Sequence, residues 1–133
     1  DLGDDRIWAA VPQAPAGYEF LAAGLDQVQV PTLIMVGDRD KTTPHSTQSV
    51  PIFEAMEGDH ALMVIEGAGH FSFTDFCWAL PADDGCGPSD LPLERVHELS
   101  NVAALAWIDV ARGETRSADW LPLVADEVSW EAK

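Results

Sequence analysis

Two titratable side chains stand just beyond two apolar runs, and their types suit proton transfer. Asp40 ends the stretch VPTLIMVGDRD, and His70 ends the stretch ALMVIEGAGH. Neighbouring parallel strands end at the same edge of a sheet, where α/β proteins hold their working residues. A carboxylate bound to one imidazole nitrogen fixes the tautomer of the ring, which can then take a proton from a nucleophile. We therefore predict that Asp40 and His70 are catalytic, as orienting acid and general base.

Asp38 competes with Asp40 for the role of the acid. It follows Gly37 directly, so it is better placed to turn the chain or to bind loop amides. We favour Asp40 as the partner of His70, and we expect Gly67 and Gly69 to permit the tight turn beneath the ring.

The elements that must position these residues follow from the hydrophobic pattern. Apolar runs without alternation predict buried parallel strands over residues 6–15, 30–40 and 61–70. Helical spacing is found over residues 43–59 and, most clearly, over 91–111, which Gly113 is placed to end. The C-terminal stretch WLPLVADEVSWEAK is predicted to be a short packed tail. The fold class is therefore α/β, with about three parallel strands and flanking helices in a single domain, residues 1–133.

Composition narrows the possible partners. The chain has 133 residues, of which 47% are hydrophobic, and a formal net charge of −16. A surface this acidic argues against nucleic acid and against anionic membranes. No segment approaches the ~20 apolar residues of a membrane span. Two explanations of this acidic charge remain open: it keeps the protein soluble, or the protein belongs to a salt-rich organism or compartment, where ions screen the repulsion between like charges.

The two cysteines, Cys77 and Cys86, lie in FCWALPADDGCG. Loop residues between them let the chain double back, so we predict a disulfide rather than two unrelated thiols. Such a bridge would contribute about 2–3 kcal/mol by loop entropy and favours a periplasmic or secreted location. His45, His60 and His97 are too scattered for a metal site, and we expect His60 and His97 to face solvent.

Three stretches resemble the C-terminal half of an α/β-hydrolase, most closely the dienelactone hydrolase and platelet-activating-factor acetylhydrolase-like esterases. They are DDRIWAAVPQAPAG, PTLIMVGDRDKTTP and LMVIEGAGHFSFTDFC. The resemblance implies a partial α/β-hydrolase fold, a carboxylic ester as small-molecule substrate and no cofactor. It matches Asp40 to the catalytic acid and His70 to the base. By the same resemblance Tyr18 falls in a loop over the active site, whereas Phe71 either walls an acyl pocket or packs in the core.

The sequence departs from that family in one respect. The family order is serine, acid, histidine, with the serine in a Gly-x-Ser-x-Gly elbow, but no serine precedes Asp40. The segment that forms the oxyanion hole is also missing. Because the sequence starts at Asp1, we expect a processed product or a fragment that lacks the nucleophile half.

Three explanations of the missing nucleophile remain open. The serine belongs to another polypeptide or a lost half, or Ser72 or Cys77 has been recruited, or the chain is a non-catalytic binding or structural module. We favour the first, because an apolar strand at residues 6–15 would otherwise leave an open edge. We expect that edge to be covered by the missing N-terminal half or by a homodimer.

Overall fold

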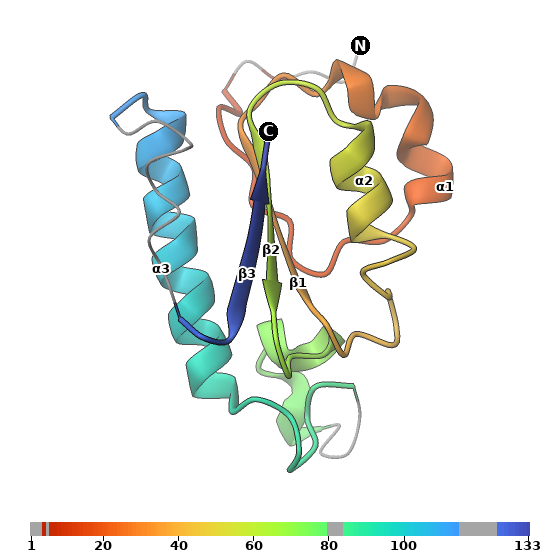
Figure 1. The fold of residues 1–133 in the computed structure, drawn as a ribbon, viewed down its shortest axis with the longest axis vertical. Coiled ribbons are helices and arrows are strands. Elements are labelled where there is room, and N and C mark those ends of the chain that lie inside the picture. Colours follow the sequence, from red (N-terminus) through yellow and green to blue (C-terminus); the bar gives the residue numbers. More distant parts are fainter. Residues whose placement is uncertain (1–3, 5, 80–83, 115–124) are drawn as a thin grey trace.

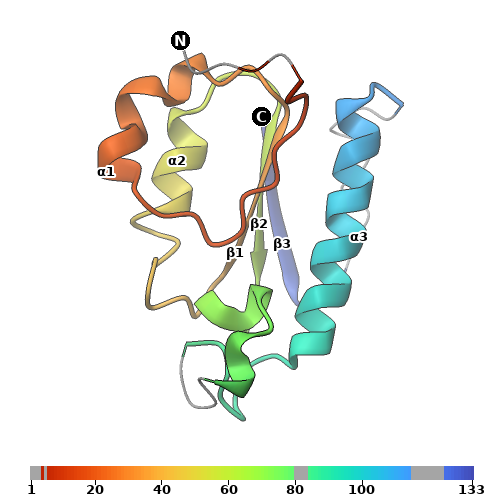
Figure 2. The same ribbon diagram turned by 180° about the vertical axis from the view of Figure 1, so that it is seen from behind.

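The computed structural model describes residues 4, 6–79, 84–114 and 125–133. The fold has three layers, in which a small sheet lies between helices on its two faces, and Figures 1 and 2 show it from opposite sides. The helices are α1 (Tyr18–Leu21), α2 (Ser49–Ala55) and α3 (Leu93–Ala111), with 3₁₀ turns at Ala22–Gln27, His70–Phe73 and Phe76–Trp78. Within the described ranges, every helix is too short or too polar to cross a bilayer.

The sheet has three strands, β1 (Thr32–Gly37), β2 (His60–Ile65) and β3 (Val128–Ala132), in the order β1-β2-β3. β1 and β2 are parallel, as predicted, and Gly37 is level with Ile65. β3 is antiparallel to β2, so the prediction of a wholly parallel sheet is wrong: the sheet is mixed. The presumed tail supplies this strand because its side chains alternate, with half-buried Val128 and Trp130 facing the core side and Ser129 exposed between them.

The predicted strand over residues 6–15 runs beside β1 in parallel but makes only isolated bridges, at Ala10 and Gln13. Three backbone hydrogen bonds join it to β1, including Leu33 N–H to Ala10 O and Met35 N–H to Pro12 O, and a fourth joins Ala10 N–H to Pro31 O just before β1. The regular pattern would also need an N–H at residue 12, which proline lacks. Pro12 thus turns a fourth strand into an interrupted edge.

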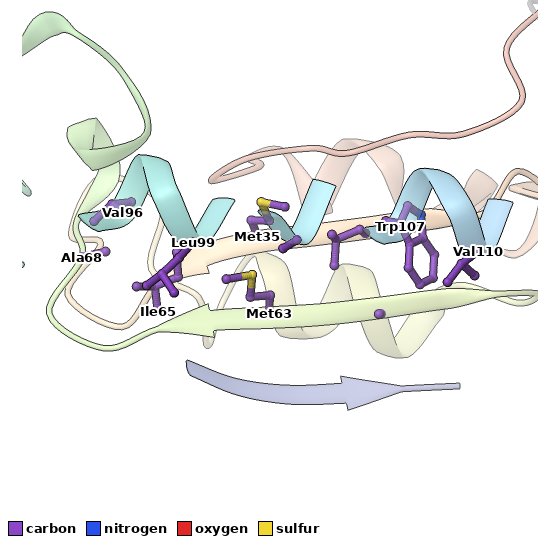
Figure 3. Packing of buried hydrophobic residues seen from close by; sticks show 11 residues of the cluster. Met35, Met63, Ile65, Ala68, Val96, Leu99, Trp107 and Val110 are labelled. Atoms are coloured by element: carbon purple, nitrogen blue, oxygen red, sulfur yellow. The ribbon is translucent and has the colours of Figure 1, made fainter. Parts of the chain in front are cut away.

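The helices cover both faces of the sheet. α3 packs on one face, where Met35 and Met63 of the strands meet Leu99 and Trp107 of the helix (Figure 3). α2 packs on the other face through Ile52 and Phe53. Full burial of side chains of this size stabilises the fold by about 1.5–3 kcal/mol each. Since both faces are covered, β1 is buried at every position.

The ends of the helices follow from local chemistry. α3 begins two residues later than predicted, after Pro92, and Gly113 ends it with a left-handed backbone (φ 74°) and an N–H bonded to Val110 O. Pro51 lies in the first turn of α2, where a missing N–H costs nothing.

The expectation that His60 and His97 face solvent is wrong, since His97 is half-buried and its Nε2 is buried. His60 is 1% exposed rather than solvent-facing, because it is the first residue of β2 and lies under α2. Its Nδ1 is 2.7 Å from Gly58 O, and its ring meets Phe53 edge-on at 4.9 Å.

Candidate active site

The loops that follow β1 and β2 lie against each other at one edge of the sheet. Asp38 N–H bonds Ile65 O, and Arg39 N–H bonds Ala68 O. A Cβ at Gly37 would collide with the carbonyl group of Ala68, so the two loops approach as closely as backbone allows. This approach sets the positions of Asp40 and His70, which follow within a few residues.

Asp40 and His70 are in direct contact. Nδ1 of His70 lies 3.0 Å from Oδ2 of Asp40. The Asp40 side chain is 0% exposed, whereas the ring of His70 is 24% exposed. Among the described residues none bonds Nε2 of His70, so the nitrogen that faces away from Asp40 is left for another reactant. A buried carboxylate in contact with a partly exposed imidazole is the arrangement that the acid and the base of a catalytic triad have.

Thr43 completes the surroundings of the carboxylate. Its backbone N–H bonds Asp40 Oδ1 at 2.6 Å, and its hydroxyl bonds Oδ2 at 2.9 Å. The same hydroxyl oxygen lies 3.0 Å from Nδ1 of His70. With its proton donated to Asp40, the hydroxyl can accept from Nδ1–H, so the network favours the tautomer with the proton on Nδ1. That tautomer leaves Nε2 unprotonated and able to accept a proton.

Asp38 has the role expected of it. Its Oδ1 accepts a hydrogen bond of 2.7 Å from the N–H of Gly67, which fixes the turn before His70. It therefore ties the two loops together and leaves Asp40 as the carboxylate at the ring.

A second buried carboxylate, Asp84, spans the same two loops. Its Oδ2 accepts hydrogen bonds from the N–H groups of Lys41 and Thr42, each 2.7 Å, and its Oδ1 accepts one of 3.2 Å from His70 N–H. Burial raises the pKa of Asp84, but these three amides and the Thr42 hydroxyl together outweigh it and hold the pKa below its usual range. Asp84 is therefore ionised in the folded protein at neutral pH.

The predicted disulfide is present between Cys77 and Cys86, with the two Cα atoms 5.2 Å apart. Cys77 therefore has no free thiol with which to act as a nucleophile. Ser72 is 0% exposed, and its hydroxyl accepts from Gly69 N–H and donates to Gly85 O. Both residues proposed as recruited nucleophiles thus have structural roles.

A sequence model of PET hydrolase-like proteins matches residues 3–79, more than half of the chain. The chain belongs to this family. The match spans β1, β2, Asp40 and His70. No curated protein matches the chain.

Membership of the PET hydrolase-like family makes the protein an ester hydrolase of the α/β-hydrolase superfamily. The resemblance inferred from the sequence is thereby confirmed at the level of the superfamily. The match does not distinguish the dienelactone hydrolase or platelet-activating-factor acetylhydrolase-like branches within it.

The two predicted substrate-binding residues of this PET hydrolase-like chain lie in different surroundings. The ring of Phe71 meets His70 edge-on, with centroids 5.1 Å apart. Tyr18 begins α1, where its N–H bonds Gln48 Oε1 and its ring packs partly buried against the α2 side of the core. Phe71 thus contacts the ring of His70, whereas the contacts of Tyr18 are with the α2 layer.

A hollow of about 550 Å³ lies at this edge. It is lined by Asp38–Lys41, by residues 84–85 and by residues 87–90, and His70 is not among its lining residues. Within the part of the chain that the structure describes, no group of three or more His, Cys, Asp or Glu side chains is arranged to hold a metal ion.

Sequence reasoning missed two residues of this site. Thr43 follows Asp40 by one short turn, so an Asp-x-x-Thr pattern could have identified it as a local cap. Asp84 carries no such signal, because its partners lie 14 residues away at His70 and 43 residues away at Lys41.

Proposed function

We propose that the protein hydrolyses carboxylic esters through a Ser-His-Asp triad to which this chain contributes Asp40 and His70. The serine comes from outside this sequence, since no serine precedes Asp40. The observation that carries the proposal is the 3.0 Å contact between His70 Nδ1 and Asp40 Oδ2 at the shared edge of two parallel strands.

In the proposed reaction the serine Oγ attacks the ester carbonyl carbon, and Nε2 of His70 takes the hydroxyl proton. The negative charge of buried Asp40 stabilises the imidazolium ion that forms. His70 then returns the proton to the leaving alkoxide, which departs as the alcohol. A water molecule, deprotonated by His70 in the same way, then attacks the acyl carbon of the acyl-enzyme. The bond to the serine Oγ breaks, His70 returns the proton to that oxygen, and the acid is released. These steps require no cofactor.

The finer features of the function are also proposals. The resemblance to dienelactone hydrolase and platelet-activating-factor acetylhydrolase-like esterases favours a small-molecule ester, with Phe71 beside the base as its wall. Tyr18 would reach the substrate only from the α2 side. The disulfide favours work in the periplasm or outside the cell, because reducing compartments do not maintain such bridges.

The interrupted edge at residues 6–14 supports a covering partner. Ile7 and Trp8, on this edge, are 57% and 48% exposed. The missing N-terminal half or a second copy of the chain would bury them and complete the sheet. In an α/β-hydrolase the nucleophile comes from that N-terminal half, so it is the occupant that would also supply the serine.

The test is to combine the chain with candidate N-terminal halves and to measure hydrolysis of a p-nitrophenyl ester. We expect turnover to appear on mixing and to be lost in His70→Ala. His97→Ala is the matched control and should retain turnover, because His97 is a half-buried histidine of α3 that lies beside Phe73 and is not bonded to Asp40. Well-folded halves that associate without turnover would instead support a non-catalytic binding or structural module.

A further inference from the structure

The carboxylate of Asp84 joins the backbones that carry the two proposed catalytic side chains. Its Oδ2 binds the N–H groups of the two residues directly after Asp40, and its Oδ1 binds the N–H of His70 itself. A single side chain therefore links the acid loop to the base loop, over and above the contact between Asp40 and His70.

Asp84 is itself held firmly. Its carbonyl accepts the N–H of Phe71 at 2.9 Å, and the next residue, Gly85, accepts the hydroxyl of Ser72 at 3.1 Å. A Cβ on either Gly69 or Gly85 would collide with the facing segment, so the two backbones are in contact. The Cys77–Cys86 disulfide closes the segment that carries Asp84. The backbone that carries the Asp84 carboxylate is thus fixed against the turn that contains His70.

We propose that Asp84 is a positioning residue, which sets the distance between the Asp40 and His70 backbones and thereby keeps His70 Nδ1 on Asp40. Its catalytic meaning rests on the proposed function, but the geometric claim does not. A displacement of about 1 Å in a reacting group can cost about 100-fold in rate. Two side chains on separate loops need a contact that fixes the distance between the loops more than two side chains on one helix or strand would.

The chemistry of the side chain makes the claim specific. Both oxygens of Asp84 accept hydrogen bonds, and no donor is required of it in these three contacts. Asparagine has the same shape but only one accepting atom. In Asp84→Asn the amide NH₂ must therefore face either the two N–H groups of the acid loop or the N–H of His70, and one loop is released.

The first experiment compares wild type, Asp84→Asn and Asp90→Asn in the 133-residue chain by ¹H–¹⁵N NMR. Asp90→Asn is the matched control: Asp90 lines the same hollow, accepts a hydrogen bond from Gly87 N–H and lies 3.6 Å from the Arg39 guanidinium. Within the described residues its carboxylate bonds no backbone N–H of the loops that carry Asp40 and His70, which is the contact that the comparison tests. The signal is the downfield Nδ1–H proton of His70, assigned by its loss in His70→Ala. We expect Asp84→Asn to lose this signal or to raise its exchange rate with water at least about 10-fold, whereas Asp90→Asn retains it. An unchanged signal in folded Asp84→Asn overturns the proposal.

A second measurement needs no variant and covers the case in which Asp84→Asn does not fold. In wild type, acidification protonates Asp84, and the amide signals of Lys41, Thr42 and His70 should move with one common midpoint, that of the Asp84 carboxyl carbon. Separate midpoints for the two loops would overturn the proposal.

The two proposals fail separately. In the assembled hydrolase, Asp84→Asn should lower kcat about 10- to 100-fold with little change in KM. If His70→Ala leaves turnover unchanged, the proposed function is wrong whatever Asp84 does. If His70→Ala abolishes turnover while Asp84→Asn keeps both kcat and the Nδ1–H signal, only the positioning role is wrong.

Discussion

Nδ1 of His70 and Oδ2 of Asp40 lie 3.0 Å apart, although the two residues stand on different loops after different strands. The parallel pairing of β1 with β2 places both loops at one edge, and the contact between Gly37 and Ala68 brings them together. The pair is thus a product of the sheet rather than of one local turn.

Asp40→Asn tests the orienting role. The Asn side chain would keep its oxygen toward Thr43 N–H and turn its NH₂ toward His70, which favours the tautomer with the proton on Nε2. Nε2 could then no longer accept the serine proton. We expect kcat in the assembled hydrolase to fall about 10⁴-fold, as tautomer errors do in triads, measured by initial rates on a p-nitrophenyl ester. Wild-type turnover in this variant would show that Asp40 is not the acid.

Thr43→Val tests the hydroxyl that supports the carboxylate. Valine has nearly the same shape, but it removes the donor to Asp40 Oδ2 and leaves that buried oxygen with fewer partners. The expected loss in unfolding free energy is about 1–3 kcal/mol, measured by urea denaturation. Thr43→Ser, which keeps the hydroxyl, should stay closer to wild type. Equal losses in both variants would assign the effect to packing.

The pair could be predicted from the sequence because each member ends an uninterrupted apolar run, and such runs identify parallel strands whose ends coincide. β3 could not be predicted so readily: Val128 and Trp130 alternate over a stretch too short to separate from a packed tail. The prediction for residues 6–15 found the right path and direction but not a full strand, because Pro12 removes one bond of the ladder. The contacts of Asp84 could not be predicted from the sequence, because they depend on how the segment after the first cysteine of the disulfide packs against His70.

Gly37→Ala tests the close approach of the loops. The new methyl group would meet the backbone carbonyl of Ala68, which cannot move without separating the ends of β1 and β2. We expect a loss of about 1–3 kcal/mol in unfolding free energy, by urea denaturation, together with weakened His70 Nδ1–H protection. Gly24→Ala is the control, because no atom lies within 4 Å of a Cβ there. It should change stability by no more than about 0.5 kcal/mol.

The pH dependence of stability tests the ionised bridge at Asp84. Burial raises the pKa of Asp84, but hydrogen bonds from the amides of Lys41, Thr42 and His70 and from the Thr42 hydroxyl lower it by more than burial raises it. The folded state therefore binds the Asp84 proton more weakly than the unfolded state does. Its stabilising contribution is therefore fully present above the unfolded value of about 3.9 and is lost as pH falls through the lower folded pKa.

At pH 7, Asp84→Asn should be less stable than wild type by about 1.5–3 kcal/mol, the range for hydrogen bonds to a charged group. Because protonated Asp84 loses that advantage, the gap should narrow as pH falls below about 4. This difference in stability is measured as unfolding free energies from urea titrations between neutral and acid pH. Asp90→Asn is measured in the same way, because it shows the effect of losing one negative charge elsewhere. A gap that stays constant over this range would mean that the carboxylate charge of Asp84 does not hold the two loops together.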